Sequence, residues 1–114
     1  MTTLDRAKQI AALIDNKKGE EVRVLQIGTL TTIGDYFVVA TGNSTTQVKA
    51  LADEVEEKLS AEGLEPKRIE GYASASWILL DYYDVIVHIF LKETREFYAL
   101  ERLWGDAPEI DWTK

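Results

Sequence analysis

The segment that most constrains the fold is "DYFVVATGNSTTQVKALADEVEEKLSAEG", residues 35–63, where an apolar run leads directly into an amphipathic pattern. Residues 35–42 are apolar almost without alternation, which is typical of a strand buried on both faces, so we expect this strand in the centre of a sheet. The residues that follow carry apolar side chains at helical spacing: Val48, Leu51, Ala52, Val55 and Leu59. Ser44 and Gln47 fit a capping box, and Gly63 suits the left-handed position after the last turn.

The residues before this unit predict a further helix and a further strand. Between Thr2 and Lys17, apolar residues recur three and four apart: Leu4, Ala7, Ala11 and Ile14. Thr2 with Asp5 fits a second capping box, and Gly19 is suited to end this helix. "EVRVLQIG", residues 21–28, is a short strand that the loop "TLTTIG" joins to the central strand. Because this loop is short, the two strands should run antiparallel.

The residues after the long helix predict three more strands and a terminal helix. "EPKRIEG" favours a weak edge strand, where Pro66 is tolerated because an edge residue can lack one ladder donor. Residues 77–80 and 85–91 are stronger strands. One face of a short helix ending at Gly105 is indicated by apolar residues at helical spacing: Phe97, Leu100 and Trp104. The tail "DAPEIDWTK" is expected to be irregular.

These elements predict an α/β (α+β) fold, a single mixed β-sheet of about five strands with flanking helices, in which the long helix is a crossover. The 114 residues suit one domain, placed at residues 1–105, with residues 106–114 as the tail. No apolar run approaches the roughly 20 residues that span a bilayer, and the N-terminal residues do not resemble a secretory signal. We therefore expect a cytoplasmic protein without a membrane partner.

The charge and the absence of cysteine exclude several chemistries. Without cysteine the chain has no disulfide, no thiolate zinc site and no cysteine nucleophile. The net charge of −7 opposes attraction to a phosphate backbone, so direct nucleic-acid binding is disfavoured. An acidic surface suits a basic protein partner, although it also serves solubility alone.

The segment "SWILLDYYDVIVHIF" raises the question of catalysis, because it places two aspartates near the single histidine of the chain. Two carboxylates that share a metal from one strand should be two residues apart, whereas Asp81 and Asp84 are three apart. A hairpin with Tyr82 and Tyr83 at its centre explains them better, since a flanking aspartate can accept hydrogen bonds from turn amides. Two tyrosines fit a two-residue turn poorly, so a longer or bulged loop stays open.

Two other polar features have structural explanations beside functional ones. By strand alternation His88 shares a face with Ile86 and Phe90, and one histidine lacks the three or four ligands that zinc requires. We expect a half-buried histidine satisfied by hydrogen bonds. "ATGNS" before a helix could hold an anion, but helix initiation alone requires the same residue types, and capping explains Ser44.

Aromatic residues are concentrated in the last third of the chain: Trp77, Tyr82, Tyr83, Tyr98, Trp104 and Trp112. Aromatic side chains are preferred anchors of protein interfaces. At least one face of the strand that contains Trp77 should pack on a helix. The other face and the tyrosine turn are therefore the candidate contact surface, with Lys92 and Arg95 as a charged rim.

Three blocks in the same order, "DYFVVATGNSTTQVKALADEV", "WILLDYYDVIVHIF" and "REFYALERLWGDAP", resemble the ribosomal silencing factor family, also called the Iojap-like family. The family usually has glycine at the position of Tyr83. The resemblance implies a nucleotidyltransferase-like fold without catalytic equipment or cofactor. It implies binding to the fourteenth protein of the large ribosomal subunit, which blocks joining of the small subunit and lowers translation under nutrient limitation or in stationary phase.

The resemblance also implies contact residues on the hairpin and near it: Trp77, Ile78, Leu80, Tyr82, Lys92 and Tyr98. Leu103 and Trp104 are expected in the core instead. Two other functions remain open. A magnesium-dependent nucleotidyltransferase would need a Gly-Ser turn, which "GNS" imitates, and two alternating strand acids, which no proposed strand has. A homodimeric interaction module would use the same aromatic surface, and a homodimer away from the ribosome is a further expectation.

Overall fold

The computed structural model describes residues 2–98, 102 and 104–114. Its elements, in chain order, are α1 (Thr3–Asn16), β1 (Glu20–Gln26), β2 (Tyr36–Gly42), α2 (Thr45–Ala61), β3 (Arg68–Glu70), β4 (Trp77–Asp81), β5 (Val85–Leu91), α3 (Lys92–Tyr98) and β6 (Glu109–Ile110). The strands form one six-stranded sheet in the order β3-β4-β5-β2-β1-β6. The α/β fold with a single mixed sheet is therefore confirmed, with one strand more than the five expected.

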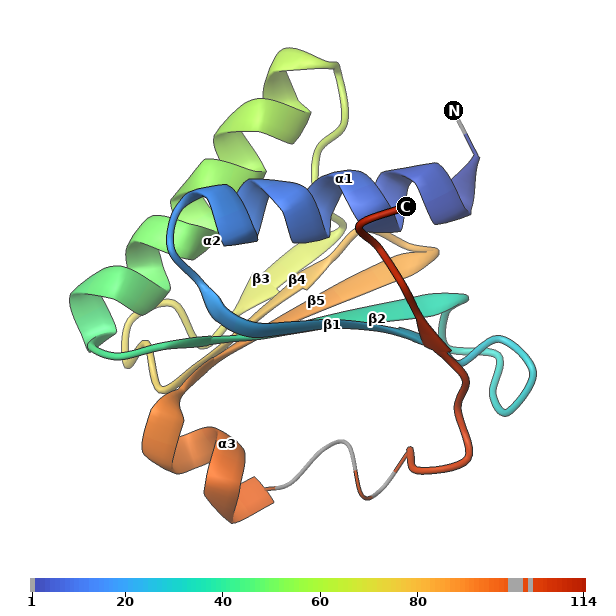
Figure 1. Ribbon diagram of the computed structural model, residues 1–114. Helices are drawn as coiled ribbons and strands as arrows, with labels where there is room; N and C mark the ends of the chain where they lie inside the picture. The colour runs from blue at the N-terminus through green and yellow to red at the C-terminus, as the bar shows by residue number, and fades with distance from the viewer. Residues whose placement is uncertain (1, 99–101, 103) are drawn as a thin grey trace.

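The central position of β2 and the crossover role of α2 are also confirmed. β2 lies between β5 and β1, runs antiparallel to β1 and runs parallel to β5. A parallel partner requires a crossover, and the chain makes it through α2 before β3, β4 and β5. Figure 1 shows α1 and α2 above the sheet and α3 below it. β3, the strand that follows Pro66, forms one edge of the sheet as predicted.

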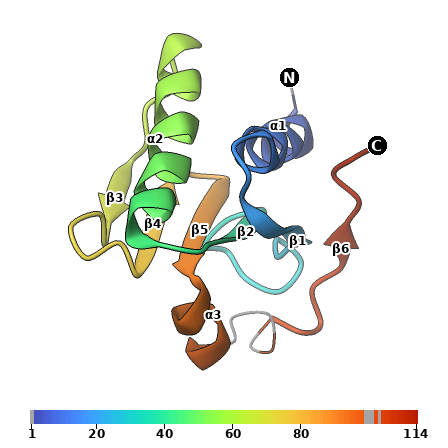
Figure 2. The same ribbon diagram turned by 60° about the vertical axis from the view of Figure 1, so that its left-hand side comes forward.

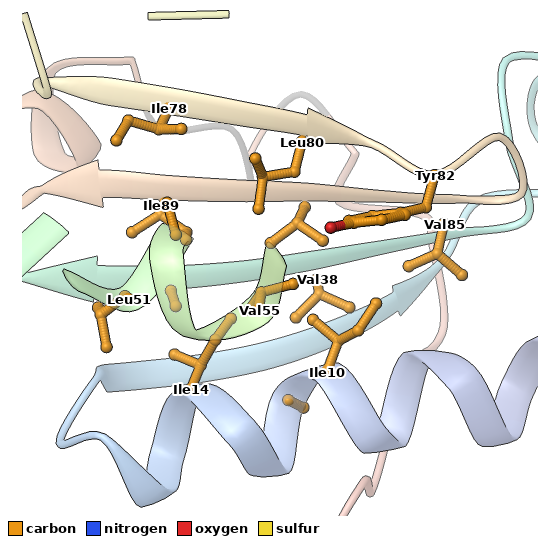
Figure 3. Close-up of a cluster of buried hydrophobic side chains, with 14 of the residues drawn as sticks. Ile10, Ile14, Val38, Leu51, Val55, Ile78, Leu80, Tyr82, Val85 and Ile89 are labelled. Atoms are coloured by element: carbon orange, nitrogen blue, oxygen red, sulfur yellow. The ribbon is translucent and has the colours of Figure 1, made fainter. Parts of the chain in front are cut away.

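The main hydrophobic core fills the space between the sheet and the two long helices. Figure 3 shows side chains from α1, α2, β2, β4 and β5 converging there, with the following fully buried: Ile10, Ile14, Val38, Leu51, Val55, Ile78 and Ile89. The apolar stripe of each helix faces this layer, as its 3.6-residue period requires. Burial of apolar side chains between this face of the sheet and the helices therefore makes the main hydrophobic contribution to stability.

The capping box predicted at Thr2 and Asp5 is confirmed, and of the one predicted at Ser44 and Gln47 only the Ser44 half is formed. The Thr2 and Asp5 side chains exchange hydrogen bonds with each other's backbone N–H at the start of α1. At the start of α2 the Ser44 hydroxyl accepts from the N–H of Gln47 at 3.1 Å. The Gln47 side chain accepts from the N–H of Asn43 rather than from that of Ser44, at 2.6 Å. These bonds satisfy backbone donors that have no partner inside the helix.

The helix ends are only partly as predicted. Gly63 has a φ of +84° and takes the left-handed position after α2, as expected. After α1, however, Lys18 takes this position with a φ of +72°, and Gly19 does not. Gly19 lies so close to Ile14 that a Cβ atom would clash with that side chain. The glycine is therefore explained by close packing and not by its backbone angle.

The C-terminal tail is not irregular throughout. Glu109 and Ile110 form β6, which pairs antiparallel with β1 at the edge opposite β3 and lies there in Figure 2. The indole Nε1 of Trp112 donates to the carbonyl of Val22 at 3.0 Å. An unpaired strand edge offers free backbone groups, and the tail uses those of β1. The expected domain boundary at residue 105 stays a prediction.

The terminal helix is described only in part. α3 begins at Lys92, directly after β5, and its described residues end at Tyr98. Leu100 and Leu103 lie outside the described residues, so the predicted continuation of the helix is not described. Gly105 lies in a turn in which its N–H donates to the carbonyl of Arg102 at 3.3 Å.

Candidate interaction surface

The two faces of β4 have different surroundings, and this difference decides which predicted contact residues can reach a partner. Ile78 and Leu80 point to the α1–α2 side, as does Tyr82 just beyond the strand (Figure 3), and they are 0%, 1% and 4% exposed. Trp77 and Leu79 alternate with them on the other face and are half-buried. The side chains of Ile78, Leu80 and Tyr82 belong to the core. They therefore offer no exposed surface for the direct contact predicted for them.

Tyr82 shows most clearly that this position is interior. Burial, with a smaller contribution from the negative charges of Glu56 and Glu65, raises the pKa of the Tyr82 phenol to about 12. Its hydroxyl oxygen is buried and has no hydrogen-bond partner among the described residues. Tyr82 is thus a neutral core residue.

The β4–β5 turn is displaced by one residue from the predicted centre. The N–H of Tyr82 donates to the carbonyl of Val85 at 2.9 Å, so Tyr83 and Asp84 are the central residues instead of Tyr82 and Tyr83. Tyr83 has a φ of +72°, a backbone angle that suits glycine. The predicted role of Asp81 is confirmed, because its Oδ1 accepts from the N–H of Tyr83 at 2.8 Å.

The acidic residues of this hairpin do not gather into a metal centre. Besides the Tyr83 amide, the Asp81 carboxylate faces the Arg68 guanidinium, with Oδ2 and Nε 3.5 Å apart. Within the described ranges, no group of three or more His, Asp or Glu side chains is arranged to hold a metal ion. Nor does any described helix have the length and apolar character needed to cross a membrane.

Among the described residues, the face of the sheet opposite α1 and α2 carries five rings in contact, which we call the aromatic row: Trp77, Phe90, His88, Phe37 and Trp104. Trp77 stacks on Phe90 with centroids 4.8 Å apart and planes 30° apart. The Phe37 ring meets His88 edge-on at 4.6 Å and Trp104 at 5.4 Å. The buried apolar residues on this face form a second, smaller core, and Trp104 packs against it, as predicted. Leu103 lies outside the described residues.

His88 is the polar member of the aromatic row and is buried, with 5% exposure. Its Nδ1 accepts a hydrogen bond from the Nε1–H of Trp77 at 3.0 Å. Its Nε2 is buried and has no partner among the described residues. Burial lowers the pKa of the imidazole to about 4, so it is neutral at pH 7. The expectation of a histidine satisfied by hydrogen bonds thus holds for one ring nitrogen, and the side chain is more deeply buried than expected.

The two basic residues predicted as a rim have different positions. Arg95 is 6% exposed and donates to the Glu21 carbonyl at 2.7 Å and to the Thr41 hydroxyl at 2.6 Å. It ties α3 to β1 and β2 and is therefore not a rim residue. The bulge in β1 at Glu21, where φ is +48°, creates this geometry. Lys92 is exposed at the start of α3, and its place in the rim stays a prediction.

An open hollow on this face is lined by Glu70, Gly71, Trp77 and Leu79. We call these four residues the Trp77 surface. Gly71 has a φ of +79°, and a Cβ there would clash with the carbonyl of Trp77, so only glycine fits this approach. Lys92 follows Leu91, whose N–H donates to the carbonyl of Ser76, the residue before Trp77, at 2.9 Å. Tyr98 closes α3, and its side chain is outside the described part of the chain.

Sequence reasoning missed Leu79, Glu70 and Gly71 as members of this surface. The signal for Leu79 was present, because strict alternation from Trp77 places it on the same face. No comparable signal marks Glu70 or Gly71, since their position depends on how β3 pairs with β4.

The chain is thus a small α/β domain whose sheet carries an apolar, aromatic face opposite α1 and α2. The model of the family described as "Ribosomal silencing factor during starvation" matches residues 1–114. The chain therefore belongs to the ribosomal silencing factor family, which confirms the resemblance seen in its three sequence blocks.

Individual relatives agree with this assignment. The chain is 45% identical over 98 residues to ribosomal silencing factor RsfS of Halalkalibacterium halodurans, covering 86% of this chain and 84% of the relative. It is 41% identical over 104 residues to RsfS of Bacillus subtilis, with 91% and 88% covered. It also resembles the crystal structure of a Chromobacterium violaceum protein, with a TM-score of 0.89, 37% identity and coverage of 92% and 88%.

Proposed function

We propose that this protein represses translation by binding the large ribosomal subunit through its fourteenth protein and excluding the small subunit from that face. The observation that carries the proposal is membership of the ribosomal silencing factor family over the whole chain. The family description includes starvation, which supports action under nutrient limitation. The protein would act in the cytoplasm, where subunits join, and it would make and break no covalent bond.

The Trp77 surface is the proposed contact. Tryptophan is enriched at interface positions that contribute most to binding, and the hollow beside Trp77 offers a place for an apolar side chain of the partner. The net charge of −7 favours approach to a basic ribosomal protein. We propose that Lys92 lies at the border of this surface and contributes to the selection of partners by charge. Tyr98 is proposed as a neighbouring contact by family resemblance alone.

The size of the domain supports steric exclusion. The molecule measures 33 × 33 × 26 Å, which is large compared with the roughly 10 Å layer of side chains between two packed elements. A body of this size on the joining face would hold the two subunits apart. The helix-covered side would then face away from the large subunit. The homodimer expected away from the ribosome would use the same apolar surface.

Sedimentation and subunit joining test this function together. The purified protein is mixed with large subunits, with intact ribosomes and with small subunits, and each mixture is separated on a sucrose gradient. We expect co-migration with free large subunits and a dose-dependent loss of joined ribosomes when small subunits are added afterwards. Equal binding to intact ribosomes, or undiminished joining at saturation, would refute steric exclusion.

A further inference from the structure

Two contacts within the described part of the chain help to hold the orientation of Trp77. Its ring stacks on Phe90 with centroids 4.8 Å apart, and its Nε1–H donates to His88 Nδ1 at 3.0 Å. An indole has one N–H and no acceptor, so this bond uses its donor. The half-buried ring therefore presents carbon atoms to the hollow that it lines with Leu79.

The hydrogen bonds of His88 indicate why an imidazole occupies this buried position. Because Nδ1 accepts from Trp77, the neutral ring must carry its proton on Nε2. That Nε2–H is buried without a partner among the described residues, which is unfavourable for folding. An apolar side chain would avoid this cost within the aromatic row. What the imidazole adds is the acceptor for the Trp77 indole.

We propose that His88 is a positioning residue of the Trp77 surface, which accepts the indole N–H and so holds Trp77 ready to receive an apolar side chain of the partner. The proposal rests on the proposed function for the identity of the partner. An aromatic ring that is already oriented loses less conformational freedom on binding. With its N–H bonded inward, the indole presents apolar ring atoms to the hollow, which favours apolar groups over hydrogen-bond acceptors.

The first half of the test uses the free protein. In a 15N-labelled sample, the Trp77 indole N–H resonance is identified as the one lost in Trp77→Phe, and its exchange with solvent is measured. His88→Phe keeps a ring but removes the acceptor. His88→Asn carries its amide oxygen on Cγ, the atom to which Nδ1 is bonded in histidine, so it can restore the acceptor. We expect faster exchange in His88→Phe and recovery of protection in His88→Asn.

The second half measures affinity for the large subunit with the same variants, each checked for a native circular-dichroism spectrum. The loss of one hydrogen bond should weaken binding by about three- to tenfold in His88→Phe, with His88→Asn recovering most of it. In a Trp77→Phe background, His88→Phe should cause no further loss, because the donor is already absent. If His88→Phe does not fold, His88→Leu takes its place.

The outcomes separate this inference from the proposed function. Unchanged indole exchange in His88→Phe would overturn positioning by His88. So would an equal loss of affinity for His88→Phe with and without the Trp77 indole. If wild-type protein fails to bind large subunits at all, the proposed function is refuted and with it the role of His88 at that contact, whereas the exchange data decide its role within the fold.

Discussion

The two faces of the sheet are built from alternate residues of the same strands but differ in chemistry. The face under α1 and α2 is packed with aliphatic side chains, among them Ile78 and Leu80 of β4. The opposite face carries the aromatic row and leaves Trp77 and Leu79 half-buried. The first face can supply stability without touching a partner, while the second combines a smaller core with a surface. Neighbouring residues of β4 should therefore respond very differently to substitution.

The largest contrast is expected between Leu80 and Leu79. Leu80→Ala removes a fully buried side chain and should lower the free energy of unfolding by about 2–5 kcal/mol. Leu79→Ala, the same change one residue earlier, should cost only about 1 kcal/mol because the side chain is half-buried. Urea denaturation of both variants measures the difference. Equal losses would contradict the assignment of the two faces.

The second contrast concerns the polar group within the aromatic row. Burial lowers the pKa of His88 from 6.5 to about 4, so between these pH values the unfolded chain binds a proton that the folded chain does not. Titration of His88 therefore costs no stability above pH 6.5. As the pH falls from 6.5 to about 4, it lowers the free energy of unfolding by about 3 kcal/mol in total. His88→Phe should lack this component. Parallel stability curves for wild type and variant across this range would show that His88 is not buried in its neutral form.

A third prediction tests how α3 is held against the face of the sheet that carries the aromatic row. Arg95→Met keeps much of the side-chain volume but leaves the buried Thr41 hydroxyl and the Glu21 carbonyl without this donor. We expect a loss of about 1–3 kcal/mol in the free energy of unfolding. Lys92→Met, one helical turn earlier and exposed, is the matched control and should change stability little. If both variants melt like wild type, Arg95 does not anchor the helix.

The smallest predicted effect lies at the turn that joins β4 and β5. Tyr83 adopts a φ of +72° and is more than half exposed, so its strained backbone is not compensated by burial of the ring. Tyr83→Gly should raise the midpoint of chemical denaturation, with a gain of at most about 1 kcal/mol. Tyr83→Ala separates the backbone effect from loss of the ring. A Tyr83→Gly variant that is less stable than Tyr83→Ala would show that strain is not released there.

Much of the fold could be predicted because its signals are local. The central strand, the crossover helix with its Ser44 cap and the antiparallel first pair each depend on residues close together in the chain. β6 could not be predicted in this way, since two residues carry no period and Glu109 and Ile110 become a strand only by pairing with β1.

The candidate site was less predictable from the sequence. Family resemblance grouped residues from both faces of β4. Alternation separates Leu80 from Trp77, but only the packing of α1 and α2 decides which of the two is buried. Arg95 was expected in the rim because it is charged. Its burial depends on the β1 bulge at Glu21, which no sequence pattern announces. The turn centre depends on a one-residue register that the Asp-Tyr-Tyr-Asp pattern leaves open.

The most direct test of the proposed contact compares one charge placed on each side of the sheet. Leu79→Lys adds a positive charge within the Trp77 surface, and a lysine stem can cover apolar neighbours while its amine reaches water. Ala50→Lys adds the same charge at an exposed position of α2, on the other side of the sheet. The dissociation constant for the large subunit should rise by the equivalent of about 2 kcal/mol or more for Leu79→Lys and stay near wild type for Ala50→Lys. Wild-type affinity of a folded Leu79→Lys variant, or a loss with Ala50→Lys alone, would contradict the account.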